Sequence, residues 1–199
     1  MKKSIITIGR EYGSGGHEIA LHLSQALSVP LYDKEILTEA AKESGFSENI
    51  FAAFDEVRES SLLYALAVGT NLYGPELPLP VQLCLEQFRT IERVAEKGPC
   101  IFVGRCADYV LRSRTDVLSV FIHAPMKDRV ARITELRSIT PQEAEKLIRR
   151  NDKKRANYYE YYTDRIWGEA STYNLTVDSS LAGLEKSAEL ILTFMNMLG

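Results

Sequence analysis

The sequence predicts an α/β protein, with a parallel sheet of about five strands covered by helices on both faces. Short apolar segments rich in β-branched residues alternate along the chain with segments whose apolar residues recur at helical spacing. The first strand is followed by a glycine-rich turn and then by a helix. Strands and helices that alternate in this way form βαβ units, so we expect the strands to run parallel.

The composition is that of one soluble, globular domain. The chain has 199 residues, of which 45% are hydrophobic and 26% charged, and a chain of this length folds without disulfide bonds. The net charge of −3 excludes a protein-wide basic field for nucleic acid. No segment approaches the ~20 apolar residues of a membrane span. The three cysteines lack metal-ligand spacing, which predicts reduced thiols in a cytoplasmic protein.

The first half of the chain begins with a buried strand over residues 4–8. Pro30 favours an extended segment at 29–32, and Asp33 is a suitable N-cap for the helix that follows it. Glycines and prolines interrupt the helical pattern of residues 59–80, which indicates an inserted segment. Further helices are predicted over residues 16–27, 47–58 and 81–96.

The second half continues the alternation. The residues Thr140-Pro141-Gln142-Glu143 predict a helix start, with a threonine cap, a proline in the first turn and a glutamate three residues after the cap. That helix runs past Arg155. Strands are predicted over residues 100–103, 117–124 and 173–177, and further helices over 127–136 and 182–198.

The turn Gly13-Ser14-Gly15-Gly16 has the position of a phosphate-binding loop. Its glycines allow backbone amides to converge at a helix N-terminus, where the helix dipole also favours an anion. The other interpretation is a plain turn between a strand and a helix. The usual P-loop pattern places a lysine and a hydroxyl residue after the last glycine of the loop, whereas this chain has Gly16 and His17 there.

Charged residues further along the chain are the next candidates. Arg105 follows a strand at the edge where open α/β sheets bind ligands, although a structural ion pair would explain it too. Arg129 and Arg132 share one helix face, and so do Asp152 and Arg155. A solvated charged face is the alternative for these residues. The aromatic run 158–162 suits core packing better than stacking on a base.

These motifs together resemble the cytidylate kinase-like family, a branch of the nucleoside monophosphate kinases among the P-loop kinases. The resemblance runs from Ile5 to about Ile191 and is carried by the segments GREYGSGGHEIA, PLYDKEIL, FVGRCADYVL, FIHAPMKDRVARI and NDKKRANYYEYYT. It implies a three-layer P-loop kinase fold, with residues 1–199 as a single domain. Within it we expect a helical insertion at about 45–98, which has no clear match to the acceptor insertion of true cytidylate kinases, and a lid region at about 126–165.

The resemblance also implies roles for particular residues, with ATP and Mg²⁺ as cofactors. ATP phosphates would be bound by the loop, that is by Gly13, Ser14, Gly15, Gly16 and His17. Asp33 would lie at the metal and acceptor site, and Ser14 is a second candidate for the metal. The residues expected to bind the acceptor are Asp33, Arg105, Asp152 and Arg155, and those expected to act on the transferring group are Arg129, Arg132, Arg155 and Asp33.

The missing lysine calls for another cation at the γ-phosphate. Arg10 and His17 are the nearby candidates. We expect Arg10 to serve, because it is always charged, whereas histidine is only partly charged near neutral pH. Val103 also stands where cytidylate kinases have an acidic residue.

The predicted function is ATP-dependent phosphoryl transfer to a nucleoside monophosphate or a similar small acceptor. One alternative is a nucleotide-binding regulatory module with weak or no kinase activity, which the missing lysine and hydroxyl suggest. Another is a P-loop kinase for a different small metabolite. Neither nucleic acid nor a membrane is an expected partner. A homodimer is compatible with the apolar segment 61–73, which could be an interface or core.

Overall fold

The computed structural model describes residues 3–33, 36 and 79–198 of the chain. By its internal contacts the chain divides into two compact units, residues 1–32 with 98–199 and residues 33–97. The second unit contains the helix α5 (Leu79–Glu96), which confirms the helix predicted there. The helices predicted after Asp33 and over 47–58 fall outside the described residues, apart from the helical residue Ile36. Within the described ranges, no helix is long and apolar enough to cross a membrane.

The first unit is built on a five-stranded sheet with the strand order β2-β3-β1-β4-β5. Every neighbouring pair of strands runs parallel, as the sequence predicts. The central strand β1 aligns Ile8 with Val103 on one neighbour and with Val120 on the other. The strands are β1 (Ile5–Arg10), β2 (Leu31–Tyr32), β3 (Cys100–Val103), β4 (Val117–His123) and β5 (Leu175–Asp178).

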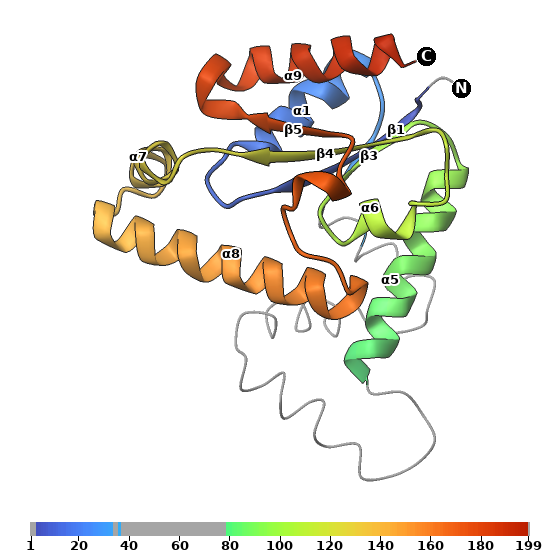
Figure 1. The fold of residues 1–199 in the computed structure, drawn as a ribbon, viewed down its shortest axis with the longest axis horizontal. Coiled ribbons are helices and arrows are strands. Elements are labelled where there is room, and N and C mark those ends of the chain that lie inside the picture. The colour runs from blue at the N-terminus through green and yellow to red at the C-terminus, as the bar shows by residue number, and fades with distance from the viewer. Residues whose placement is uncertain (1–2, 34–35, 37–78, 199) are drawn as a thin grey trace. The chain divides into compact units, whose positions relative to one another are not determined.

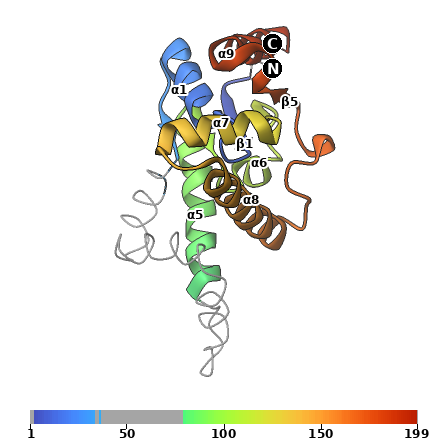
Figure 2. The same cartoon turned by 90° about the vertical axis from the view of Figure 1, so that its left-hand side faces the viewer.

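Helices cover both faces of this sheet. The helices α1 (Gly16–Leu27) and α9 (Ser179–Met197) lie on one side, and α6 (Ala107–Val110) and α8 (Pro141–Thr163) on the other (Figures 1 and 2). Burial of apolar side chains between the sheet and the first pair stabilises this arrangement. The fully buried members of this core include Ile6, Ile8, Ile19, Leu23, Ile101, Leu118, Val120, Ile122 and Ile191.

A smaller apolar cluster joins α8 to α7 (Met126–Arg137). It contains Ile133 of α7 and Ala144 and Ile148 of α8, with the ring of Tyr12 packed against them. The start of α8 is the predicted capping box, in which Thr140 and Glu143 each accept a hydrogen bond from the other's backbone amide. This pair of helices therefore packs against the segment that follows β1.

The aromatic run at the end of α8 mostly packs inside the protein. Tyr158 and Tyr159 are buried, as the core interpretation predicts, while Tyr161 is 58% exposed. The three cysteines are buried, free thiols. Burial raises the pKa of the Cys100 thiol to about 12.

Some element boundaries differ from the sequence prediction. The strand predicted over 173–177 begins instead at Leu175 and is preceded by a short 3-10 helix, Ala170–Thr172. The last helix begins at Ser179 and contains a break at Gly183, where φ is +79° and ψ is 175°. The helix α6 has no counterpart in the prediction, because four residues are too few to show a helical period.

Candidate phosphate-binding site

The loop of residues 11–15 connects β1 to α1 and has the backbone geometry of an anion site. Gly13 and Gly15 have φ values of +83° and +78°, in the left-handed region that favours glycine. Gly15 is the N-cap of α1 and provides no side-chain hydrogen bond to the first turn. The amides of that turn are consequently left without a capping side chain, and they coincide with the positive end of the helix dipole.

Two helices close around this loop. A β-carbon on Gly15 would clash with a methyl group of Leu184 from α9, and it would lie 3.4 Å from Cζ of Arg132. The Arg132 guanidinium is half-buried and, within the described part of the chain, makes no hydrogen bond or ion pair. Its positive charge therefore lies beside the loop backbone and is available to an anion there.

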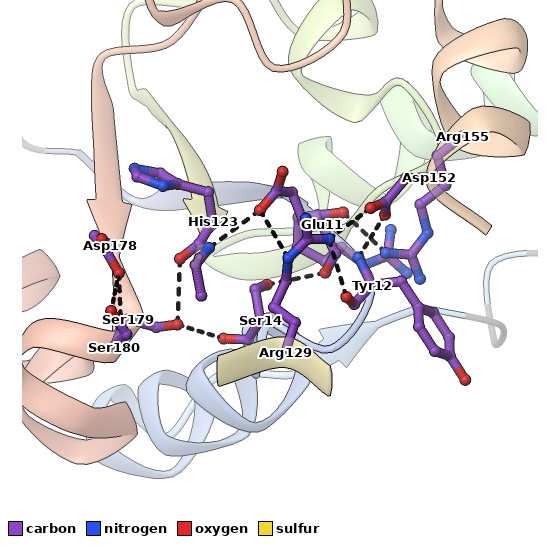
Figure 3. A network of polar contacts seen from close by, with 12 residues as sticks. Glu11, Tyr12, Ser14, His123, Arg129, Asp152, Arg155, Asp178, Ser179 and Ser180 are labelled. Carbon is purple, nitrogen blue, oxygen red and sulfur yellow. Dashed lines mark hydrogen bonds and ion pairs between the residues drawn. The ribbon is translucent and has the colours of Figure 1, made fainter. Parts of the chain in front are cut away.

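A buried ion cluster clamps the loop to α7 and α8 (Figure 3). Arg129 is only 6% exposed, and its Nη1 donates to Oδ2 of Asp152 at 2.5 Å and to the carbonyl of Tyr12 at 3.3 Å. Its Nε lies 3.4 Å from Oε2 of Glu11. The other carboxylate oxygen of Asp152 accepts a 2.7 Å hydrogen bond from the amide of Tyr12. Both members of the Arg129–Asp152 pair are thus engaged in holding the loop.

Ser14 lies inside the loop and is fully buried. Its hydroxyl donates to the carbonyl of Glu11 at 2.9 Å. Its own carbonyl accepts a 2.6 Å hydrogen bond from Ser179, at the start of α9 (Figure 3). Asp178 caps that helix by accepting from the amide of Ser180 at 2.9 Å. The serine therefore stabilises the loop from within and ties it to the end of β5.

The turn after β3 presents the predicted arginine. Arg105 is half-buried, and both it and Cys106 adopt left-handed φ values, +61° and +56°. Two successive non-glycine residues in this region are uncommon and are found at functional turns. Behind the turn, Tyr159 of α8 donates a 2.5 Å hydrogen bond to Asp108, and burial raises the pKa of that carboxyl. The bond anchors α6, and with it the Arg105 turn, to α8.

Arg155 of α8 contacts the segment at the end of β1 and the start of the loop. Its Nη1 donates to the carbonyl of Arg10 at 2.8 Å, and its Cζ lies 5.5 Å from the ring centre of Tyr12. His17 is exposed in the first turn of α1. Asp33 is the first residue of the other unit.

The family of the chain is shown by comparison with protein-family models. The model described as the cytidylate kinase-like family matches residues 5–181. The chain belongs to this family. A comparison with curated proteins found no match.

Comparison with solved structures shows which proteins share the fold of this chain. An uncharacterised protein from Eubacterium ventriosum is 26% identical, with a TM-score of 0.75 over 98% of this chain and 99% of that one. A shikimate kinase from Bacteroides thetaiotaomicron has 13% identity and a TM-score of 0.55 over 96% and 98% of the two chains. A shikimate kinase from Acinetobacter baumannii in complex with shikimate has 12% identity and a TM-score of 0.52 over 98% and 94%. The chain therefore belongs to a kinase-like family and has the α/β fold of the P-loop kinases.

The sequence does not single out several residues of this candidate site. Glu11 and Tyr12 precede the predicted loop Gly13–Gly16 and were not candidates, yet they carry the contacts of this segment to Arg129 and Asp152. Ser179 and Leu184 were not considered, although both contact the loop. An Asp-Ser-Ser sequence directly after a strand is a recognisable cap signal, but the residue that its serine contacts lies 165 positions away.

Proposed function

We propose that this protein is an ATP-dependent phosphotransferase whose acceptor is a nucleoside monophosphate or a similar small phosphate compound. The observation that carries the proposal is the convergence of guanidinium groups on an uncapped helix N-terminus. Arg132 and Arg155 approach the glycine loop from α7 and α8. Loop amides and arginines together provide the preorganised positive environment that phosphoryl transfer requires.

The acceptor would be held at the turn after β3. Arg105 is the proposed contact to the acceptor phosphate, because a guanidinium forms paired hydrogen bonds with phosphate oxygens. Arg155 lies on the loop side and would contact phosphates of either nucleotide. In the reaction, an oxygen of the acceptor phosphate forms a bond to the γ-phosphorus of ATP, the bond to the bridging β–γ oxygen breaks, and ADP leaves. No proton needs to move when the attacking oxygen belongs to a phosphate dianion.

The residues differ in how well they suit Mg²⁺. The described part of the chain holds no group of three or more His, Cys, Asp or Glu residues that could bind a metal. This fits an ion bound mostly through nucleotide phosphates and water with one or two carboxylates. We assign the role of metal ligand to Asp33 and not to Ser14, because the Ser14 hydroxyl is buried and donates to the backbone carbonyl of Glu11. When bound, Mg²⁺ would neutralise charge on the β- and γ-phosphates.

In this proposal Arg129 and Asp152 act as positioning residues. Each is bonded to the loop backbone at Tyr12 and to the other. Their effect on catalysis would therefore come through the shape of the loop and not through contact with a substrate. Arg132 is the lid arginine proposed to contact the transferring group.

The test is a transfer assay with ATP labelled at its γ-phosphate. The acceptor panel would contain the common nucleoside monophosphates, together with shikimate, because shikimate kinases share the fold. We expect labelled nucleoside diphosphate and unlabelled ADP in equal amounts. Arg105→Ala gives the background. Absence of transfer above that background to every acceptor would refute the proposal. Transfer to shikimate alone would favour the alternative of a kinase for a different metabolite.

A nucleotide-binding module is the second candidate function. The absence of a lysine at position 16 and of a hydroxyl at position 17 favours it. Calorimetry with ATP and CMP distinguishes the two candidates. Micromolar binding of a nucleotide without product formation would support the module, whereas binding with turnover would support the kinase.

A further inference from the structure

Position 16 holds a glycine where the P-loop pattern has a lysine, and the space around this glycine is already filled. Gly16 is buried at the start of α1. A β-carbon on it would lie 2.5 Å from Cβ of Arg10 and 2.9 Å from Cγ of the same residue. Carbon atoms in contact lie about 3.5–4.0 Å apart. A side chain at position 16 and the Arg10 side chain in this position therefore exclude each other.

The Arg10 side chain continues from there to the end of β3. A β-carbon on Gly104, the first residue after β3, would lie 3.2 Å from Cζ of Arg10 and would clash with its Nη1. The Gly104 amide donates to the carbonyl of Ile8 at 2.9 Å, which fixes the turn beside β1. The guanidinium of Arg10 consequently lies between the N-terminus of α1 and the turn that carries Arg105.

We infer that Arg10 supplies the charge that the lysine supplies in other P-loop kinases, and that its guanidinium contacts the transferred phosphoryl group and the acceptor phosphate together. This inference rests on the proposed function. A guanidinium carries five N–H donors in a planar fork and can bind two oxyanions at once, whereas a lysine ammonium is a compact point charge. Arg10 forms no covalent bond and transfers no proton. It balances charge on the phosphoryl oxygens as the bond to ADP breaks.

Its placement gives Arg10 two roles where the usual lysine has one. The side chain of a lysine at position 16 would extend from α1, on the side of the proposed ATP site. The Arg10 side chain extends instead from β1, and its guanidinium lies beside Gly104. Loss of the Arg10 charge should therefore impair both ATP binding and use of the acceptor. The other candidate cation, His17, is exposed and follows Gly16 in the first turn of α1.

The first experiment measures nucleotide binding without turnover. Arg10→Gln keeps a polar side chain and removes the charge. We expect its affinity for ATP, measured by calorimetry, to fall by about 10- to 100-fold, as for the loss of one charge-assisted contact. Its affinity for adenosine, which has no phosphate for Arg10 to contact, should stay within about threefold of wild type. Thermal melting reports whether the variant remains folded.

The second experiment exchanges the two positions. Arg10→Gln should lower kcat by about 10²–10³ and raise the KM of the acceptor. The double variant Arg10→Gly/Gly16→Lys introduces the lysine of the usual P-loop pattern into the space that Arg10 vacates, and leaves His17 in place of the hydroxyl residue. We expect it to regain at least about tenfold in kcat over Arg10→Gln, while the KM of the acceptor stays raised. Recovery of kcat without recovery of the acceptor KM would show that Arg10 contacts the acceptor as well as the phosphoryl group that ATP donates.

The control is Arg150→Gln, and His17→Asn tests the competing candidate cation. Arg150 is exposed on α8, so its loss removes the same charge away from the loop. An Arg10→Gln variant with wild-type ATP affinity and kcat would overturn the inference, and so would a loss of both in His17→Asn alone. If the wild-type protein binds ATP and transfers phosphate, and Arg10→Gln changes neither property, the inference about Arg10 is wrong but the proposed function stands. A wild-type protein that does neither overturns the proposed function as well.

Discussion

At the residue scale, the turn after β3 combines an unusual backbone conformation with an arginine that is proposed to bind the acceptor. Arg105 and Cys106 adopt left-handed φ values, which cost of order 1 kcal/mol for residues with a side chain. A glycine adopts the same conformation without that cost. Selection of an arginine at position 105 is therefore better explained by what its guanidinium contacts than by the turn.

Replacing this arginine by glycine keeps the backbone and removes the guanidinium. We expect Arg105→Gly to fold and to raise the KM of the phosphate acceptor by about 10- to 100-fold, as for a lost charge-assisted hydrogen bond. Steady-state kinetics at saturating ATP measure it. Ser138→Gly is the matched control, because Ser138 has a φ of +52° at the end of α7. If Arg105→Gly leaves the KM of the acceptor unchanged, Arg105 does not bind the acceptor.

Gly16 offers a test of side-chain packing that does not depend on activity. Gly16→Ala should destabilise the fold by about 1–3 kcal/mol, because its β-carbon overlaps the Arg10 side chain close to the backbone. In an Arg10→Gly background the same change should cost less than about 0.5 kcal/mol, since alanine is otherwise favourable in a helix. Urea unfolding of the wild type, the two single variants and the double variant gives the coupling free energy between positions 10 and 16. Equal costs in the two backgrounds would contradict the packing described here.

At the element scale, the loop is held in place by α7, α8 and α9. Arg129 connects Glu11 and Tyr12 to Asp152 in a setting from which water is largely excluded. Ser179 joins the loop to the start of α9. Three elements that are distant in sequence thus hold one short segment, which keeps its amides preorganised for an anion.

Removal of the central cation should unfold this arrangement. Arg129→Met keeps an unbranched apolar stem but removes the guanidinium and leaves the carboxylates of Glu11 and Asp152 without their cation. We expect a loss of about 3–5 kcal/mol in the free energy of unfolding, the usual cost of breaking a buried ion pair from one side. The control is Arg149→Met, whose exposed pair with Glu145 should contribute about 0.3–0.5 kcal/mol. Similar effects in the two variants, measured by denaturant unfolding, would exclude a structural role for Arg129.

A helix or strand could be predicted where its sequence pattern is local, and could not be predicted where its form depends on distant contacts. The strands β1, β3 and β4 are continuous apolar runs, and the capping box of α8 is local in sequence, so both were predicted. The break at Gly183 in α9 has no such signal, since one glycine within an amphipathic pattern is compatible with an unbroken helix. The contacts of Arg129 and Asp152 were also beyond prediction, because helical spacing shows which residues share a face but not what that face meets.

At the scale of the whole molecule, several surface carboxylates resist protonation in the folded state. The paired hydrogen bonds from Arg114 lower the pKa of Asp116 from its usual 3.8 to about 2. Hydrogen bonds from Thr140 and Ser180 lower the pKa of Glu143 and Asp178 in the same way. Because these folded-state pKa values lie below those of the unfolded chain, the carboxylates stabilise the fold above the unfolded pKa. That stability is lost as the pH falls through the folded value.

Asp116 should show this dependence most clearly. Asp116→Asn should lower the free energy of unfolding at pH 6 by about 1 kcal/mol, a modest value because solvent screens the pair with Arg114. The difference from wild type should shrink as the pH falls from about 4 toward about 2, where Asp116 itself becomes protonated. Urea unfolding at a series of pH values measures it. A difference that does not vary with pH would show that the pair leaves the pKa of Asp116 unchanged.

The parallel sheet and the glycine-rich turn between β1 and α1 could be predicted from the sequence, because apolar runs and glycine spacing are local signatures. The strand order β2-β3-β1-β4-β5 could not, since it depends on how the crossovers pack. The path of the Arg10 side chain from Gly16 to Gly104 was equally out of reach, because it joins two glycines far apart in the chain. The sequence could raise Arg10 as a candidate, but only coordinates show the space that it fills.

The most direct test of this account is transfer of labelled γ-phosphate from ATP to a panel of nucleoside monophosphates by the wild-type protein. The account predicts a labelled nucleoside diphosphate formed in equal amount with ADP. It also predicts a drop of about 10²–10³ in that rate for Arg10→Gln with the fold retained. ATP binding without transfer to any acceptor would contradict it and would leave a nucleotide-binding module in place of a kinase.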